Sequence, residues 1–101
     1  MKNFRTLNLA IAFYQDCQKL KNKLKLTGAM KDQFERASLS IPLNLSEGSA
    51  KSSAKERRKF YRTSLGSLRE IQCILTLINN SDLSPQADVL GAHLFCLSRN
   101  T

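Results

Sequence analysis

The sequence has few of the residues that several fold classes require. Its 101 residues include four glycines, two prolines, three cysteines, one histidine and no tryptophan. Few glycines and prolines disfavour the many tight turns of a sheet protein, whereas abundant Leu, Lys, Ala and Arg favour helices. No apolar run approaches the roughly 20 residues of a membrane span. We therefore predict one all-α domain over residues 1–101, with no membrane segment.

The three cysteines, Cys17, Cys73 and Cys96, are odd in number and far apart in the sequence. Such spacing provides neither a disulfide framework nor a pair of metal ligands. All three fall within predicted helices, so we expect buried free thiols and a reducing compartment. The apolar run from Leu7 to Tyr14 contains an asparagine and lacks a small-x-small cleavage site, which disfavours a secretion signal. We predict a cytoplasmic protein.

Apolar residues recur at intervals of three and four along most of the chain, which is the period of one helix face. Interruptions of this pattern predict four helices, over about residues 3–25, 29–49, 53–78 and 85–99. Short connections favour an antiparallel up-down-up-down four-helix bundle. The fourth helix is predicted to be short, at about 15 residues, so one end of the bundle should be less well covered.

A proline lies inside the second predicted helix. Pro42 lacks a backbone donor, so the segment could split there into two helices. Unbroken apolar spacing from Met30 to Gly48 instead favours one helix that is bent at the proline. Ser53 and Glu56 have the spacing of a capping box at the start of the third helix.

The first predicted helix carries two neighbouring apolar stripes. One stripe contains Leu7, Ala10, Ile11, Tyr14, Cys17 and Leu24, and the other contains Leu9, Phe13 and Leu20. Together they cover an arc on the order of 200°, about twice what a surface helix needs. We expect a partner surface to cover part of this arc.

Polar residues border the apolar face of the second predicted helix. Antiparallel pairing with the third helix places Glu47 near Arg57 and Arg36 near Glu70. It also places polar side chains between these pairs opposite one another. We predict a structural hydrogen-bond seam, formed by Arg36, Ser40, Asn44, Glu47, Ser67 and Glu70.

The formal charge of +8 is concentrated in two segments, 19–31 and 51–62, each with a net charge of +5. Concentrated positive potential attracts the phosphates of RNA or DNA, although basic clusters also occur as plain solvated surface. The candidate nucleic-acid-binding residues are Lys51, Lys55, Arg57, Arg58, Lys59 and Arg62, joined at the same end by Lys2 and Arg5. Phe60 and Tyr61 either stack on bases or pack in the core.

Catalytic chemistry finds little support in the sequence. His93 is the only histidine, and no carboxylate or cysteine stands at a persuasive metal-binding interval from it. No Gly-rich phosphate loop, nucleophile elbow or metal-binding repeat occurs. We predict a protein that is not an enzyme and that holds no cofactor or metal.

One stretch resembles a known family. Arg36-Ala37, Ser40-Ile41 and Asn44 to Gly48, followed by Phe60 and Gly66 to Glu70, are similar to the pattern of the bacterial proteins encoded in intervening sequences of 23S ribosomal RNA genes, also called S23-type ribosomal proteins. Leu45 and Ser46 stand where the pattern has Ile and Ala. The resemblance covers about residues 5–80.

The resemblance implies an antiparallel four-helix bundle that assembles as a ring-shaped homopentamer. The family is similar to the accessory variability proteins of diversity-generating retroelements, which are basic pentamers that bind nucleic acid and a reverse transcriptase. The leading hypothesis is therefore a non-enzymatic homo-oligomer that binds RNA or DNA through its basic residues and is linked to the 23S rRNA intervening sequence. The alternative is a protein-interaction scaffold that binds a protein partner without binding nucleic acid directly.

Overall fold

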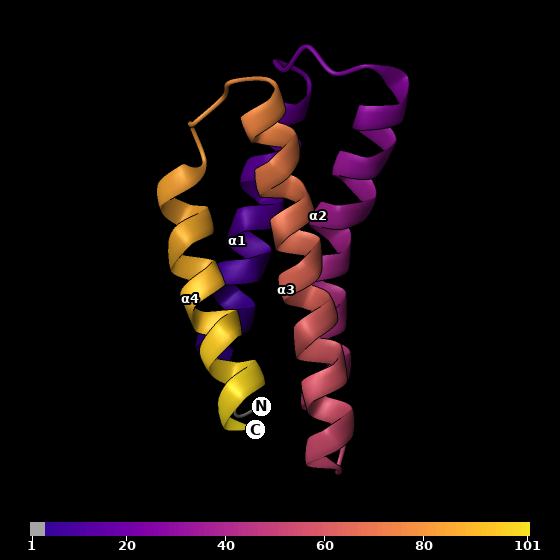
Figure 1. The fold of residues 1–101 in the computed structure, drawn as a ribbon, viewed down its shortest axis with the longest axis vertical. Helices are drawn as coiled ribbons and strands as arrows, with labels where there is room; N and C mark the ends of the chain where they lie inside the picture. The colour runs from indigo at the N-terminus through magenta and orange to yellow at the C-terminus, as the bar shows by residue number, and fades with distance from the viewer. Residues whose placement is uncertain (1–3) are drawn as a thin grey trace.

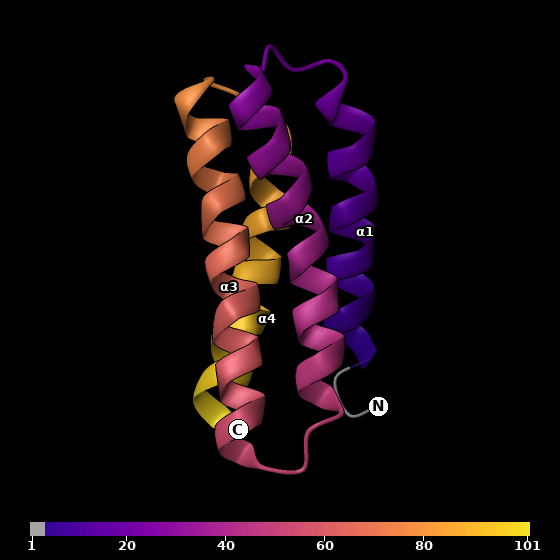
Figure 2. The same cartoon turned by 90° about the vertical axis from the view of Figure 1, so that its right-hand side faces the viewer.

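The structure, a computed structural model, describes residues 4–101 and contains four helices: α1 (Phe4–Lys21), α2 (Gly28–Ser49), α3 (Ala54–Leu77) and α4 (Ser84–Asn100). No strand occurs within this range. Each helix packs against its sequence neighbours, and α1 also packs against α4. Figures 1 and 2 show that successive helices run in opposite directions and that the start of α1 and the end of α4 lie at the end of the bundle with the α2–α3 turn. The predicted all-α four-helix fold is confirmed.

Helix α1 ends at Lys21, four residues before the predicted end. Lysines at alternate positions from Lys19 to Lys25 create like-charged pairs four residues apart, which weaken a continuing helix. The Lys23 N–H instead donates to the Leu20 carbonyl at 2.8 Å, closing a tight turn. Thr27 then caps α2, because its hydroxyl accepts a hydrogen bond from the Met30 N–H at 3.2 Å.

Helix α2 continues through Pro42 without interruption, so the alternative of two shorter helices is wrong. Pro42 has no N–H to donate to the Ser38 carbonyl, one turn earlier, so α2 lacks one helical hydrogen bond there. Beside the proline, the buried Ser64 hydroxyl of α3 donates to the Ile41 carbonyl at 2.8 Å. This bond does not replace the missing one, but it joins α2 to α3 at the proline.

Helix α3 is the longest, with 24 residues, and starts as predicted at a cap in which the Glu56 N–H donates to the Ser53 hydroxyl. Its first turns and the α2–α3 turn extend beyond the ends of α1 and α4 (Figures 1 and 2). Helix α4 has 17 residues, only one fewer than α1, so it is short mainly in comparison with α2 and α3. None of the helices within residues 4–101 combines the length and apolarity needed to span a membrane.

The apolar arc of α1 is largely covered within the chain. Ala10, Phe13 and Cys17 are buried, and Leu9 and Leu20 pack against the same core. Helices α2 and α4 pack against α1 and cover much of the arc, while Ile11 remains 39% exposed. That a partner surface covers part of this arc stays a prediction. The large apolar side chains left exposed in the described part of the chain are distributed over all four helices: Ile11, Leu39, Leu43, Leu77, Val89 and Phe95.

Candidate nucleic-acid interface

The start of α3 presents a stripe of exposed basic side chains. Lys55, Lys59 and Arg62 are spaced by four and three residues, so they share one helix face over about 10 Å. All three are exposed, and no carboxylate within residues 4–101 forms an ion pair with them. We call these three residues the basic stripe. Their charges are free to attract an anion from solution.

Two further arginines from this segment are held by backbone carbonyls. One guanidinium nitrogen of Arg57 donates to the Lys51 carbonyl at 3.1 Å and to the Ser52 carbonyl at 2.8 Å. The Arg58 guanidinium donates to the Thr101 carbonyl at 2.9 Å, which ties α3 to the end of α4. Because the neutral carbonyls of Lys51 and Ser52 do not cancel a positive charge, Arg57 still contributes to the local potential.

Lys51 lies in the turn between α2 and α3. Its ammonium group is 3.2 Å from the Glu47 carboxylate, one helical turn earlier, and 5.4 Å from the centre of the Phe60 ring. Such contacts between exposed groups are weak but restrict the lysine to the turn. Tyr61 is fully buried and its hydroxyl is 3.2 Å from that of Ser49, so it is not available for stacking on bases.

The two basic segments lie at opposite ends of the bundle. Segment 19–31 spans the connection between α1 and α2, whereas segment 51–62 spans the α2–α3 turn and the start of α3 (Figure 2). Arg5, at the start of α1, is exposed at the same end as the second segment. Lys2, predicted to join it, lies outside the described residues. The positive charge therefore forms two separate surfaces on one copy of the chain.

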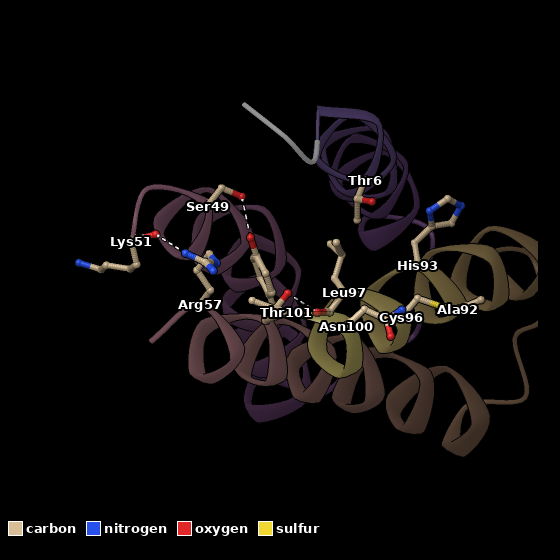
Figure 3. Close-up of a pocket in the computed structure, with 11 residues that line it drawn as sticks. Thr6, Ser49, Lys51, Arg57, Ala92, His93, Cys96, Leu97, Asn100 and Thr101 are labelled. Carbon is tan, nitrogen blue, oxygen red and sulfur yellow. Dashed lines mark hydrogen bonds between the residues drawn. The ribbon is translucent and has the colours of Figure 1, made fainter. Parts of the chain in front are cut away.

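A pocket of about 890 Å³ lies beside the α2–α3 turn (Figure 3). All four helices or their connections contribute to it, and most of its wall comes from the last three turns of α4. Sequence reasoning did not find this pocket, because its lining residues are distant in sequence and form no motif. They are Thr6, Ser49, Lys51, Arg57, Tyr61, Ala92, His93, Cys96, Leu97, Asn100 and Thr101.

The polar residues between α2 and α3 are only partly arranged as predicted. The hydroxyls of Ser40 and Ser67 are 2.8 Å apart, and the Asn44 amide donates to the Ser40 hydroxyl at 2.8 Å. These contacts connect the two helices near their midpoints. Every described buried side-chain nitrogen or oxygen has a hydrogen-bond partner, so this interior contact is polar without being unsatisfied.

The charged residues predicted at the two ends of the seam do not form the predicted pairs. Glu47 pairs with Lys51, not with Arg57, because the Arg57 guanidinium is directed to the carbonyls of the turn. Arg36 and Glu70 are both exposed, and no ion pair joins them. Hydration of these long side chains competes with a weak surface ion pair, so they are free to separate.

The cysteines differ from one another. Cys17 is buried, and burial, followed by the nearby negative charge of Asp16, raises the pKa of its thiol to about 12. Cys73 and Cys96 are exposed, so the prediction of three buried thiols is wrong for these two. Helix periodicity alone does not say which face an isolated cysteine occupies. Among residues 4–101, no three His, Cys, Asp or Glu side chains lie close enough together to hold a metal ion.

Comparison with known proteins identifies the family. Residues 2–94 match the model of the family described as 23S rRNA-intervening sequence protein. No curated protein and no solved structure gives a significant match. The family match covers most of the chain, including α1 to α3 and the first part of α4, in agreement with the resemblance of residues 36–48 and 60–70. This chain belongs to the 23S rRNA-intervening sequence protein family.

Proposed function

We propose that this protein is a non-enzymatic nucleic-acid-binding protein that contacts the phosphate backbone of RNA through the end of the bundle at the α2–α3 turn. The observation that carries the proposal is the basic stripe, Lys55, Lys59 and Arg62, which is exposed and has no ion-pair partner among the described residues. The family's connection with the 23S rRNA intervening sequence favours RNA over DNA. Free thiols in the described structure are compatible with action in the reducing cytoplasm.

The arrangement suits backbone contact better than base readout. Three cations along one helix face can neutralise successive phosphates and release their counterions. Arg57 adds charge from a position held by carbonyls of the turn, which reduces the conformational entropy lost on binding. Contacts of this kind position a nucleic acid without reading its sequence.

Salt titration tests the proposal directly. A protein in which the basic stripe is neutralised, Lys55→Gln with Lys59→Gln and Arg62→Gln, is compared with wild type on a synthetic RNA stem-loop of about 20 base pairs. The plot of log affinity against log salt has a negative slope, and loss of three phosphate contacts should make it shallower by about 2 to 3. Affinity at low salt should fall by at least tenfold.

A matched control makes the same charge change at the other end of the bundle. Lys23, Lys25 and Lys31 are exposed, and replacing all three by glutamine removes the same charge. The control should keep most of the affinity and slope. Equal losses in both proteins would show non-specific attraction to the whole molecule, and no binding by wild type at low salt would eliminate the proposal.

Self-association is the second part of the proposal. The family resemblance implies a homopentamer, and Leu39 and Leu43, which are 44% and 58% exposed on one face of α2, offer an apolar surface for it. Light scattering should give a mass about five times that of one chain. Leu39→Lys with Leu43→Lys should reduce the mass, whereas Gln33→Lys with Ser46→Lys, at exposed polar positions of the same helix, should not. A wild-type monomer at micromolar concentration would contradict this part.

The same exposed leucines favour the alternative, a scaffold that binds another protein. In that case a protein should be captured from nuclease-treated lysate, and neutralising the basic stripe should leave the capture unchanged. Loss of capture in the Leu39→Lys, Leu43→Lys protein alone, together with no RNA binding by wild type, would favour the scaffold.

A further inference from the structure

The pocket beside the α2–α3 turn shares residues with the proposed RNA-binding end. Lys51 and Arg57 line it and also belong to the basic segment that begins α3. Figure 3 shows both at one side of the pocket, while the α4 residues stand at the other. Arg57 is two residues from both Lys55 and Lys59, so it lies on the side of α3 opposite the basic stripe, at the same end of the bundle. An RNA that contacts both the stripe and the pocket must therefore pass around the exposed end of α3.

The charge of the lining favours an anion. Of its eleven residues, two are permanent cations and none is Asp or Glu. The Arg57 guanidinium is already held by two carbonyls, and the Lys51 ammonium lies between Glu47 and the Phe60 ring. Arg57 is thus positioned before any ligand arrives, which lowers the entropic cost of binding a phosphate. The Lys51 side chain points away from the other lining residues in Figure 3 and adds only to the local positive potential.

The remaining wall combines apolar and hydrogen-bonding groups. Ala92 and Cys96 are exposed on α4, Leu97 and His93 are partly buried, and Thr6 is buried on α1. The pocket therefore extends from the exposed edge of α4 toward α1. A nucleobase has flat apolar faces and a polar edge, so it matches such a wall. The volume of about 890 Å³ falls within the usual range for small-molecule sites and accommodates a nucleotide with water.

We infer that the pocket holds one unpaired nucleotide of the bound RNA, with its phosphate at Arg57 and its base against Leu97 and His93. This inference rests on the proposed function. It adds a preference for an unpaired nucleotide next to a helix, since a base within a duplex cannot enter a pocket without leaving its stack.

The single histidine provides a direct readout. Because the chain has one histidine, the imidazole C–H signals in an NMR spectrum report only on His93. Adenosine and uridine monophosphates should shift these signals in a saturable manner, whereas inorganic phosphate at the same concentration should not. An equal response to phosphate would overturn the inference of a base-binding site.

Filling the pocket tests its role in RNA binding. Two RNA stem-loops are compared, one fully paired and one with a single bulged nucleotide in the same stem. Wild type should bind the bulged RNA about tenfold more tightly. Ala92→Trp should remove this preference while keeping the affinity for the paired stem-loop. Cys96→Trp is a second filling variant should the first fold poorly, and Ala29→Trp, at an exposed position at the start of α2, is the matched control.

The outcomes separate the two proposals. Equal binding of both stem-loops by wild type would overturn the nucleotide pocket and leave backbone binding intact. Retention of the bulge preference in both filled proteins would also overturn it. Failure to bind either stem-loop at low salt would eliminate the proposed function and the pocket inference with it.

Discussion

Gly48 of α2 lies against Phe60 of α3 so closely that a Cβ atom built on the glycine would be 2.8 Å from the Phe60 Cβ. The same atom would be 3.0 Å from the ring of Tyr61. The Phe60 Cβ is attached directly to the backbone, so it cannot move aside without moving α3. The pair therefore sets the separation of α2 and α3 next to the turn that carries Lys51 and leads into the basic stripe.

Substitution of Gly48 tests this close approach. Gly48→Ala improves helix propensity by about 1 kcal/mol but overpacks the contact at a cost of about 1 to 3 kcal/mol. We expect a net loss of stability of up to about 2 kcal/mol in urea unfolding. At Gly66, also inside a helix, a Cβ would meet nothing within 4 Å, so Gly66→Ala should stabilise by about 0.5 to 1 kcal/mol. Equal gains in stability from Gly48→Ala and Gly66→Ala would contradict the close approach of Gly48 to Phe60.

The hydrogen bond between Ser64 and the Ile41 carbonyl provides a second stability test. Ser64→Ala removes a buried interhelical donor and should destabilise the protein by about 0.5 to 1.5 kcal/mol. Thr76 is exposed and its hydroxyl bonds only within α3, so Thr76→Ser, which keeps that hydroxyl, should change stability by less than about 0.5 kcal/mol. Thermal and urea unfolding measure both. Equal changes in stability in Ser64→Ala and Thr76→Ser would show that the hydrogen bond from Ser64 to the Ile41 carbonyl does not stabilise the bundle.

The cysteines should differ in their reaction with iodoacetamide. With a pKa of about 12, Cys17 has on the order of one thiolate in ten thousand molecules at pH 8, and it is also buried. Mass spectrometry of the native protein should show rapid labelling of Cys73 and Cys96 only. Denatured protein, the control, should be labelled at all three sites. Rapid native labelling of Cys17 would show that its helix opens.

The ion pair between Lys21 and Glu35 links α1 to α2 at the other end of the bundle, with 2.7 Å between the charged atoms. The hydrogen bond and charge of Lys21 lower the pKa of Glu35. Its contribution to stability is therefore present above the ordinary glutamate pKa and is lost as pH falls through the lowered value. Carbon-13 NMR titration should show a higher Glu35 pKa in Lys21→Gln.

Lys31→Gln is the control for that titration. Lys31 acts on Glu35 only through its charge and is the weaker influence, so its removal should raise the pKa less. A larger rise in Lys31→Gln than in Lys21→Gln would contradict the assignment.

Part of the site was predictable because two helices joined by a short turn have few possible registers. Pairing through the turn places Ser40 and Asn44 so that they face residues 63–67, and the Ser67 hydroxyl of that region donates to the Ser40 hydroxyl. The same reasoning did not place Arg36 and Glu70, since a backbone register does not decide where long exposed side chains lie. It also missed the carbonyl partners of Arg57, which exist only once the turn has its final shape.

The four helices follow from the amino-acid sequence, because apolar periodicity and capping act over a few residues. The family and the crowding of positive charge into two segments, one of which contains the basic stripe, can also be read from the sequence. The tertiary structure sets which thiols are exposed and how the arc of α1 is covered. It alone also produced the pocket, because Thr6, Lys51 and His93 come from separate elements and meet only when α1 and α4 pack beside the α2–α3 turn.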